Sequence, residues 1–286
     1  MRLRDILLFF LLLLLWGCEE PIFLDVPIGA TRTIIDANVS ESSSLSRIVL
    51  SRSLPFNDTT SFPPIENASV VLFPTNFGTN TFPFTYEGTF SFGALYVPQN
   101  QIRLIPKQFY TLNVFLPGNE VEQDTLFQAQ VKVPTEVPID RISFRESDQN
   151  YIVRIHFTDP EKEQNYYSWR VSQKINGQFV LLTPTRIPLS TDQGIDGKSV
   201  FVEYPFTSFS TLDTIQVHLK SIDASVYNYY VAVNNLIEAS GTNASVENPP
   251  SNFASTEAGQ SPLGFLSVES VSDSEVFAVI DSVTNK

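Results

Sequence analysis

The sequence predicts an all-β protein made of two consecutive antiparallel β-sandwich domains, with one short helix in the second domain. From residue 32 onward, most of the chain consists of short runs rich in β-branched and aromatic residues, in which apolar and polar positions alternate. Clusters of Pro, Gly, Asn and Asp, which favour turns, separate these runs. Only 223–239 has apolar residues spaced three or four positions apart, as a helix requires.

The first domain is predicted to span residues 32–135. Its strand candidates are the runs 33–39, 47–51, 68–73, 110–116 and 125–133. Pro134 and Pro138 follow the last run, and we place the domain boundary there because proline restricts φ and donates no ladder hydrogen bond. The domain is expected to be an immunoglobulin-like, fibronectin-like or carboxypeptidase-regulatory-like sandwich.

The second domain is predicted to span residues 136–286 and to be a sandwich of the same immunoglobulin or fibronectin kind. Alternation is clearest in 151–157, 167–172 and 215–220, as expected for antiparallel strands with one solvated face. The helix is expected over 223–239, with Asp223 as its N-cap and Gly241 as its stop. Two further strands, 263–268 and 275–281, are expected to end the chain.

The N-terminus has the features of a bacterial lipoprotein signal. Arg2 and Arg4 precede an uninterrupted apolar run of 11 residues, which is too short to span a bilayer. Cys18, the only cysteine in the chain, follows directly and resembles the lipidated cysteine of a lipobox. We therefore expect a signal peptide at 1–17, an acylated Cys18 and a tether at 18–31. The alternative is an ordinary secretory signal with an incidental cysteine.

Two acidic residues follow that cysteine. Glu19 and Glu20 resemble the signal that displays lipoproteins of Bacteroidota on the outer face of the outer membrane, so cell-surface exposure is expected. The alternative is a charged spacer. The formal net charge of −13 makes nucleic acid an unsuitable partner.

The chain shows no sequence motif of a catalytic or nucleotide-binding site, and we expect no enzyme activity, no catalytic residue and no cofactor. His156 and His218 fall on the polar faces of alternating strands, where we expect solvated side chains rather than members of a Ser-His-Asp triad. Asp192 and Asp196 are weak candidates for a calcium site, since hard cations prefer oxygen ligands. Together with Asp159 they lie among turn-forming residues, so turn formation is the main interpretation.

Aromatic residues are frequent in the chain, which has 23 Phe, and they say more about possible contact surfaces than the acidic residues do. Several lie between residues 56 and 92, near Pro, Gly or Asn. Because aromatic residues are enriched at interfaces, Phe77, Phe82 and Phe84 are candidates for contact with a partner or ligand. The main alternative is that these side chains fill the core of the sandwich.

Short segments along the mature chain resemble an uncharacterised family of Bacteroidota outer-membrane lipoproteins. The segment Ile34-Ile35-Asp36-Ala37-Asn38-Val39 resembles the opening strand of that family, and Leu263-Gly264-Phe265 resembles its closing strand. The other matching segments are 49–53, 110–114, 131–134, 138–140, 159–160, 165–167, 190–192, 195–198, 227–229 and 249–252. The family is a domain of unknown function that is often encoded beside TonB-dependent receptors.

The resemblance implies a location and neighbours more than an activity. It leads us to expect an outer-membrane lipoprotein that is an accessory or ligand-binding partner of a TonB-dependent transporter in nutrient uptake. Two other functions stay open, namely a surface adhesion or structural lipoprotein, and a hydrolase of glycans or peptides that would use the acidic loops. No catalytic residue is known for the family, so the resemblance assigns none here.

Overall fold

The computed structural model describes residues 30–41, 46–55, 58–76, 80–118, 123–148, 150–204, 208–210, 213–239, 247–257, 261–274 and 277–278. All strands and the helix below belong to one compact unit, Thr31–Leu54 with Thr59–Lys286. The other unit comprises Met1–Ala30 and Pro55–Asp58. The predicted signal peptide, Cys18 and all of the predicted tether except its last two residues lie outside the described residues. No helix among the described residues is long and apolar enough to cross a membrane.

The predicted fold class is confirmed, because the described chain is mostly β-strand. In chain order, the strands are β1 (Thr33–Ser40), β2 (Arg47–Arg52), β3 (Ser69–Pro74), β4 (Phe82–Phe90), β5 (Gly93–Pro98), β6 (Phe109–Leu116), β7 (Thr125–Lys132), β8 (Ile139–Ser147) and β9 (Asn150–Thr158). They continue with β10 (Tyr166–Ile175), β11 (Gln178–Leu181), β12 (Leu189–Thr191), β13 (Ser199–Glu203), β14 (Thr214–Ile222), β15 (Phe253–Ser255), β16 (Leu263–Asp273) and β17 (Phe277–Ala278). The helix α2 (Ala224–Ala239) follows β14 directly.

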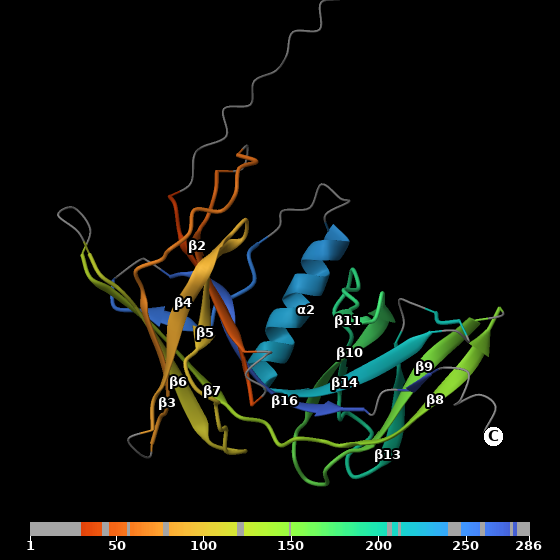
Figure 1. The fold of residues 1–286 in the computed structure, drawn as a ribbon. Coiled ribbons are helices and arrows are strands. Elements are labelled where there is room, and N and C mark those ends of the chain that lie inside the picture. The colour runs from red at the N-terminus through yellow and green to blue at the C-terminus, as the bar shows by residue number, and fades with distance from the viewer. Residues whose placement is uncertain are drawn as a thin grey trace, which may run out of the picture. The chain divides into compact units, whose positions relative to one another are not determined.

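Hydrogen bonds connect most of the strands into one long sheet path (Figure 1). Its order is β11-β10-β14-β16-β1-β2-β5-β4-β3-β6-β7-β15, and a second sheet has the order β13-β9-β8. Two hydrophobic cores form within this arrangement. The first is enclosed by β1 to β7 with β15 and β16, and the second by β8, β9, β10, β13 and β14.

Alternation along the strands explains both cores. In β1, Ile35, Ala37 and Val39 are buried while the residues between them, Asp36 and Asn38, are more exposed, as expected for a strand with one face in the core. The buried Tyr96 keeps its hydroxyl group bonded, and an unpaired buried hydroxyl would be unfavourable. Tyr96 Oη donates to the Ile65 carbonyl at 2.9 Å.

The predicted division at residue 135 differs from the structure in one respect. Two strands from the C-terminal part return to the first sheet, where β15 pairs antiparallel with β7 and β16 pairs parallel with β1. Phe253, Leu266 and Val268 accordingly belong to the first core. The last residues of β16 then pair with β14, so a single strand joins both halves of the sheet path.

The predicted helix is confirmed, beginning one residue later than expected. Asp223 is its N-cap, because Asp223 Oδ1 accepts a hydrogen bond from the Ser225 main-chain N–H at 2.7 Å. Val226 is buried in a small cluster with Ile222 and Phe265. The helix packs on β16, β10 and β12 (Figure 1). The predicted stop, Gly241, lies outside the described residues.

Candidate functional site

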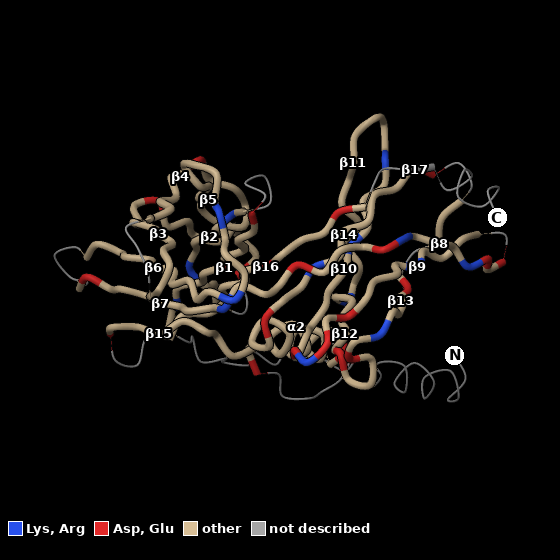
Figure 2. Tube along the Cα trace, turned by 90° about the horizontal axis from the view of Figure 1, so that it is seen from below, with Lys and Arg blue, Asp and Glu red and all other residues tan. Residues whose placement is uncertain are grey.

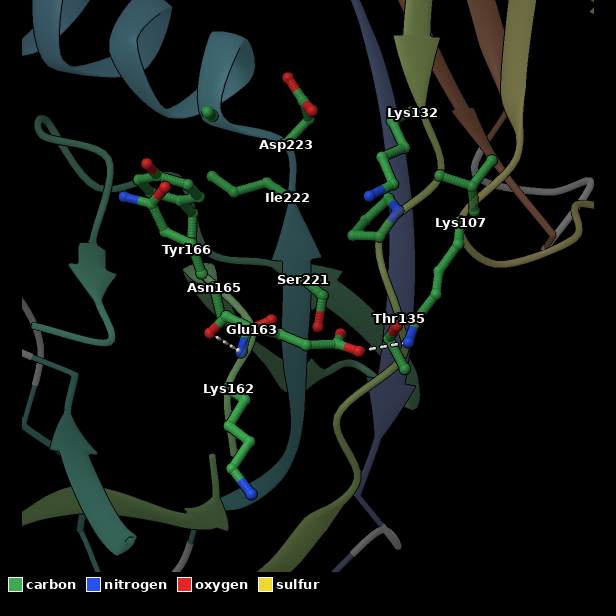
Figure 3. A pocket seen from close by; sticks show the side chains of 14 residues that line it. Lys107, Lys132, Thr135, Lys162, Glu163, Asn165, Tyr166, Ser221, Ile222 and Asp223 are labelled. Atoms are coloured by element: carbon green, nitrogen blue, oxygen red, sulfur yellow. Dashed lines mark hydrogen bonds and ion pairs between the residues drawn. The ribbon is translucent and has the colours of Figure 1, made fainter. Parts of the chain in front are cut away.

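A cavity of about 430 Å³ opens beside the junction between β14 and α2 (Figure 3). We call it the lysine cavity, because Lys107, Lys132 and Lys162 line it. Its other polar lining residues are Thr135, Glu163, Gln164, Asn165, Tyr166, Ser221 and Asp223. The volume falls within the range of small-molecule sites, which is roughly 300–1,000 Å³.

The loop that leads into β10 forms one wall of the lysine cavity, and the acidic residues predicted as a weak metal site hold this loop in place. Asp196 Oδ1 accepts from the Lys162 main-chain N–H at 2.8 Å, and Asp192 Oδ2 accepts from that of Asn165 at 2.9 Å. Among the described residues, no group of three or more His, Cys, Asp or Glu side chains is arranged to hold a metal ion. The main chain thus uses one oxygen of each carboxylate, as expected for the turn-forming role that the sequence favours, and the calcium site stays a prediction.

Asp159, the third acidic candidate, is also used by the fold. It is 1% exposed, and its carboxylate accepts hydrogen bonds from the Tyr167 hydroxyl and from the Gly197 main-chain N–H. Burial raises the pKa of Asp159, and the bond from Tyr167 opposes that shift. Because one carboxylate oxygen accepts from Tyr167 and the other from Gly197, Asp159 links β10 to the loop around residue 197.

An ion pair crosses the lysine cavity from Lys107 to Glu163 (Figure 3). Lys107 has a φ of 68° in the turn before β6, and its main-chain N–H donates to the Val133 carbonyl at 2.8 Å. The hydrogen bond from Lys107 lowers the pKa of Glu163, and the charges of Lys107 and Lys132 lower it further. Glu163 is therefore an ionised carboxylate whose charge is neutralised within the cavity.

Ser221 lies at the buried side of the lysine cavity. The residue is 4% exposed, and its hydroxyl has no hydrogen-bond partner in the described part of the chain. Its main chain is fixed in the sheet, where Ser221 pairs with Tyr167 on one side and Ser270 on the other. Figure 3 shows its side chain directed into the same space as that of Glu163. Burying an unpaired hydroxyl costs about 1–3 kcal/mol, so the position is unfavourable unless something else binds there.

A buried ion pair lies between β14, β16 and the helix. Lys220 and Glu269 have side chains that are 7% and 1% exposed, respectively. Tyr230 Oη from α2 and Ser267 Oγ each donate to Glu269 Oε1 at 3.2 Å. Burial opposes ionisation of Glu269, but the charge and hydrogen bond of Lys220 outweigh it and hold the pKa of Glu269 below its ordinary value. The cluster fastens α2 to the sheet.

A Ser-His-Asp row, which the sequence did not reveal, crosses three adjacent strands. Ser172 Oγ lies 2.9 Å from His218 Nε2, and His218 Nδ1 lies 2.6 Å from Asp273 Oδ1. The distances match a catalytic triad, but Ser172 is 6% exposed and pairs in the ladder on both sides, with Leu181 and with Gln216. Its main-chain N–H is thus unsuited to an oxyanion hole, which acyl transfer requires. We interpret the row as a cross-strand hydrogen-bond network.

The other histidine makes a similar cross-strand contact. His156 Nε2 lies 2.7 Å from Ser143 Oγ, and the His156 ring lies 5.4 Å from that of Phe201. Partial burial lowers the pKa of His156, and the charges of Arg141 and Arg154 lower it further. Both histidines lie on the faces opposite the core, where the sequence predicted them, but each bonds to a neighbouring strand.

The hairpin formed by β10 and β11 exposes a group of apolar side chains. Ile175, Phe179, Val180 and Leu181 are each between 39% and 44% exposed. The two-residue turn Asn176-Gly177 has positive φ at both positions, as in the tight turns that suit β-hairpins. The described part of β11 pairs with β10 alone, and the hairpin extends beyond its neighbours in Figure 2. An exposed edge strand of this kind is a surface on which another strand can pair.

The three phenylalanines that we predicted to contact a partner or ligand are not equally exposed. Phe84 is 5% exposed and belongs to the first core, and Phe82 packs against that core, so our expectation that they contact a partner is wrong for Phe84. Phe77 lies outside the described residues. Among the described residues of this region, the exposed aromatics are Phe62, Tyr86, Phe90 and Phe92, and the rings of Phe90 and Phe92 stack with centroids 5.3 Å apart.

Comparison with protein families gives one clear result. The model of a domain of unknown function, DUF4249, matches residues 19–275. The chain belongs to the DUF4249 family. This confirms the predicted membership in an uncharacterised domain family, and the matched range includes every residue of the lysine cavity and of the β10–β11 hairpin. No curated protein matches the DUF4249 chain.

One solved structure shows a low similarity to the DUF4249 chain. A DUF4785 family protein from Legionella pneumophila subsp. pneumophila str. Philadelphia 1 is 8% identical, with a TM-score of 0.24. The alignment covers 67% of this chain and 52% of that one, so the DUF4249 chain spans about half the length of the Legionella protein.

Proposed function

We propose that the DUF4249 chain is a lipid-anchored protein of the outer membrane that acts as an accessory or ligand-binding partner of a TonB-dependent transporter in nutrient uptake. The lipobox-like sequence at Cys18 supports the anchor, and Glu19 and Glu20 support display at the cell surface. The resemblance to Bacteroidota lipoproteins encoded beside TonB-dependent receptors supports the partner. Two or more acyl chains on one cysteine would hold the protein at the membrane stably.

The exposed β10–β11 hairpin is the observation that carries this proposal. Three consecutive residues of β11, Phe179, Val180 and Leu181, are exposed although they are large and apolar. Because side chains alternate along a strand, both faces of β11 are apolar and uncovered. A soluble protein normally protects such an edge with charge, proline or a covering loop. A transporter segment that adds a strand to β11 would satisfy the free edge and cover these side chains.

Co-purification from native membranes in a mild detergent tests the proposal. We expect the full-length lipidated chain to bring down a TonB-dependent barrel in a stoichiometric amount. Cys18→Ala should reduce recovery, because the anchor concentrates the chain at the membrane. Val180→Lys should abolish recovery of the barrel, because a partner strand that pairs with β11 would have to bury the lysine.

Ile105→Lys is the matched control for the hairpin variant. Ile105 is 53% exposed and lies in a loop, so a lysine there changes the charge equally without affecting an edge strand. Unchanged recovery with Val180→Lys would remove the hairpin from the proposal. If the lipidated chain comes down without any barrel, the transporter role fails, and a surface adhesion or structural lipoprotein becomes the better interpretation.

A further inference from the structure

We propose that the lysine cavity is a binding site for a small oxyanion, a ligand that carries a carboxylate or phosphate group, and that Ser221 and Lys132 hold it. This inference is independent of the transporter partner, because it depends on the cavity alone.

One buried donor in the cavity, the Ser221 hydroxyl, lacks a partner in the described chain, whereas both lining carboxylates accept hydrogen bonds. Glu163 accepts from Lys107, and Asp223 accepts from both the main-chain N–H and the hydroxyl of Ser225. Each carboxylate thus has one oxygen that already accepts from a donor of the chain, Glu163 Oε1 and Asp223 Oδ1. The Ser221 hydroxyl has no partner in the described chain and is 4% exposed. A hydroxyl can donate as well as accept, so a ligand that brings an acceptor oxygen would give Ser221 a partner.

Charge favours an anion over a neutral acceptor. Three lysines line the cavity against two carboxylates, Glu163 and Asp223, whereas the whole chain carries a net charge of −13. Lys107 is engaged with Glu163, and the Lys162 side chain is 81% exposed and pairs with Glu161. Lys132 is the lysine that remains for a ligand. The first residue of α2, Ala224, also lines the cavity, so the positive end of the helix dipole adds to the field there.

The two groups have complementary tasks in this site. The pairing of β14 with its two neighbouring strands fixes the position of Ser221. Its buried hydroxyl can therefore donate only to a ligand oxygen that lies at one place in the cavity. Lys132, at the end of β7, supplies a mobile charge that attracts the anion and forms a charge-assisted bond. A phosphate and a carboxylate share these requirements, so the chemistry of the cavity defines an oxyanion rather than one compound.

Calorimetric titration of the full lipidated chain in neutral detergent tests the proposal, with inorganic phosphate and succinate as separate probes at low, constant ionic strength. We expect one saturable site for at least one probe. Ser221→Ala and Lys132→Met should each weaken binding at least 5-fold. Binding of phosphate alone identifies a phosphate site, binding of succinate alone a carboxylate site, and binding of both a general oxyanion site.

Ser61→Ala and Lys174→Met are the matched controls, because both residues are exposed and lie outside the cavity. Each should change affinity less than 2-fold. Melting curves accompany every titration, and Ser221→Ala should melt at the same or a higher temperature, since it removes an unpaired buried hydroxyl. The proposal is overturned if neither probe binds at millimolar concentration, if Ser221→Ala binds as the parent does, or if Lys174→Met weakens binding as much as Lys132→Met.

Discussion

Removing one partner of the buried pair Lys220–Glu269 should destabilise the protein strongly. The two side chains are 7% and 1% exposed, so either variant leaves a charge in a poorly hydrated place. Loss of one member of a buried pair costs about 3–5 kcal/mol. We therefore expect Lys220→Met and Glu269→Leu each to lower the free energy of unfolding by that amount. This is a large part of the roughly 5–15 kcal/mol that stabilises a typical domain.

The double variant Lys220→Met with Glu269→Leu should be much less destabilised than the sum of the single variants. It removes both buried charges, but it leaves the hydroxyl groups of Tyr230 and Ser267 without their acceptor. Those unpaired groups limit the recovery, so a net cost of about 1–3 kcal/mol is expected. The coupling energy from the double-mutant cycle should then be at least about 3 kcal/mol.

Urea unfolding followed by the fluorescence of Trp169, which is 6% exposed in the second core, measures these changes. Lys107→Met is the matched control, because it breaks an ion pair whose side chains are 57% and 37% exposed and should leave the free energy of unfolding almost unchanged. A loss below about 1 kcal/mol in Lys220→Met, or a coupling energy near zero, would refute the claim that this pair fastens the helix to the sheet.

Three further predictions concern single positions. Gly264→Ala should lower the free energy of unfolding by more than about 2 kcal/mol or prevent folding, because φ at Gly264 is +89° and an added Cβ would lie 2.2 Å from a main-chain oxygen of β1. Gly177→Ala is its control in the same urea experiment and should cost about 1 kcal/mol, because φ is +85° but the space around the residue is open. Asp223→Ala should lower the free energy of unfolding by about 0.5–2 kcal/mol through loss of the helix cap, and a capping Asp223→Ser should restore most of it. Hydrogen bonds from Arg145, then from Arg154, lower the pKa of Glu203 from 4.5 to about 2. The stabilisation that the ionised Glu203 gives the folded state is therefore present above pH 4.5 and is lost as the pH falls toward 2, and after allowance for solvent screening it is roughly 1 kcal/mol. Arg145→Met should make the free energy of unfolding depend less on pH in this range.

Local patterns predicted β1, β9, β14 and the helix α2, but they gave no strand at β4, β5 or β8 and did not indicate which strands pair. The alternation at 151–157 and 215–220 reports which side chains face a core, and those strands formed as β9 and β14. The helix could be predicted because its apolar spacing and its cap are both local. Nothing local to β16 indicates that it pairs in parallel with β1, more than 200 residues earlier, so the two-domain boundary placed this strand with the wrong core.

The lysine cavity could be predicted only in part. Lys107, Lys132 and Glu163 each have the sequence context of an ordinary surface residue, and only the fold brings them together. Ser221 did carry a signal, since it follows Val217 and Leu219 at the same spacing and so lies on the apolar face of its strand. A polar residue on a core-facing position is a feature worth testing. The sequence pointed instead to the aspartates in the turns, although an aspartate in a turn most often accepts hydrogen bonds from the main chain.

The hairpin and the lysine cavity use different residues of the DUF4249 chain, and this separates the two proposals experimentally. Val180→Lys alters an edge strand and leaves every residue that lines the cavity in place, so it should abolish recovery of the barrel while phosphate or succinate binds as before. Ser221→Ala should do the reverse. Loss of both activities in both variants would mean that ligand and partner are thermodynamically linked, and linkage requires that bound ligand change the affinity for the barrel by the same factor as the barrel changes the affinity for the ligand. Repeating the co-purification with and without the bound oxyanion measures that factor directly.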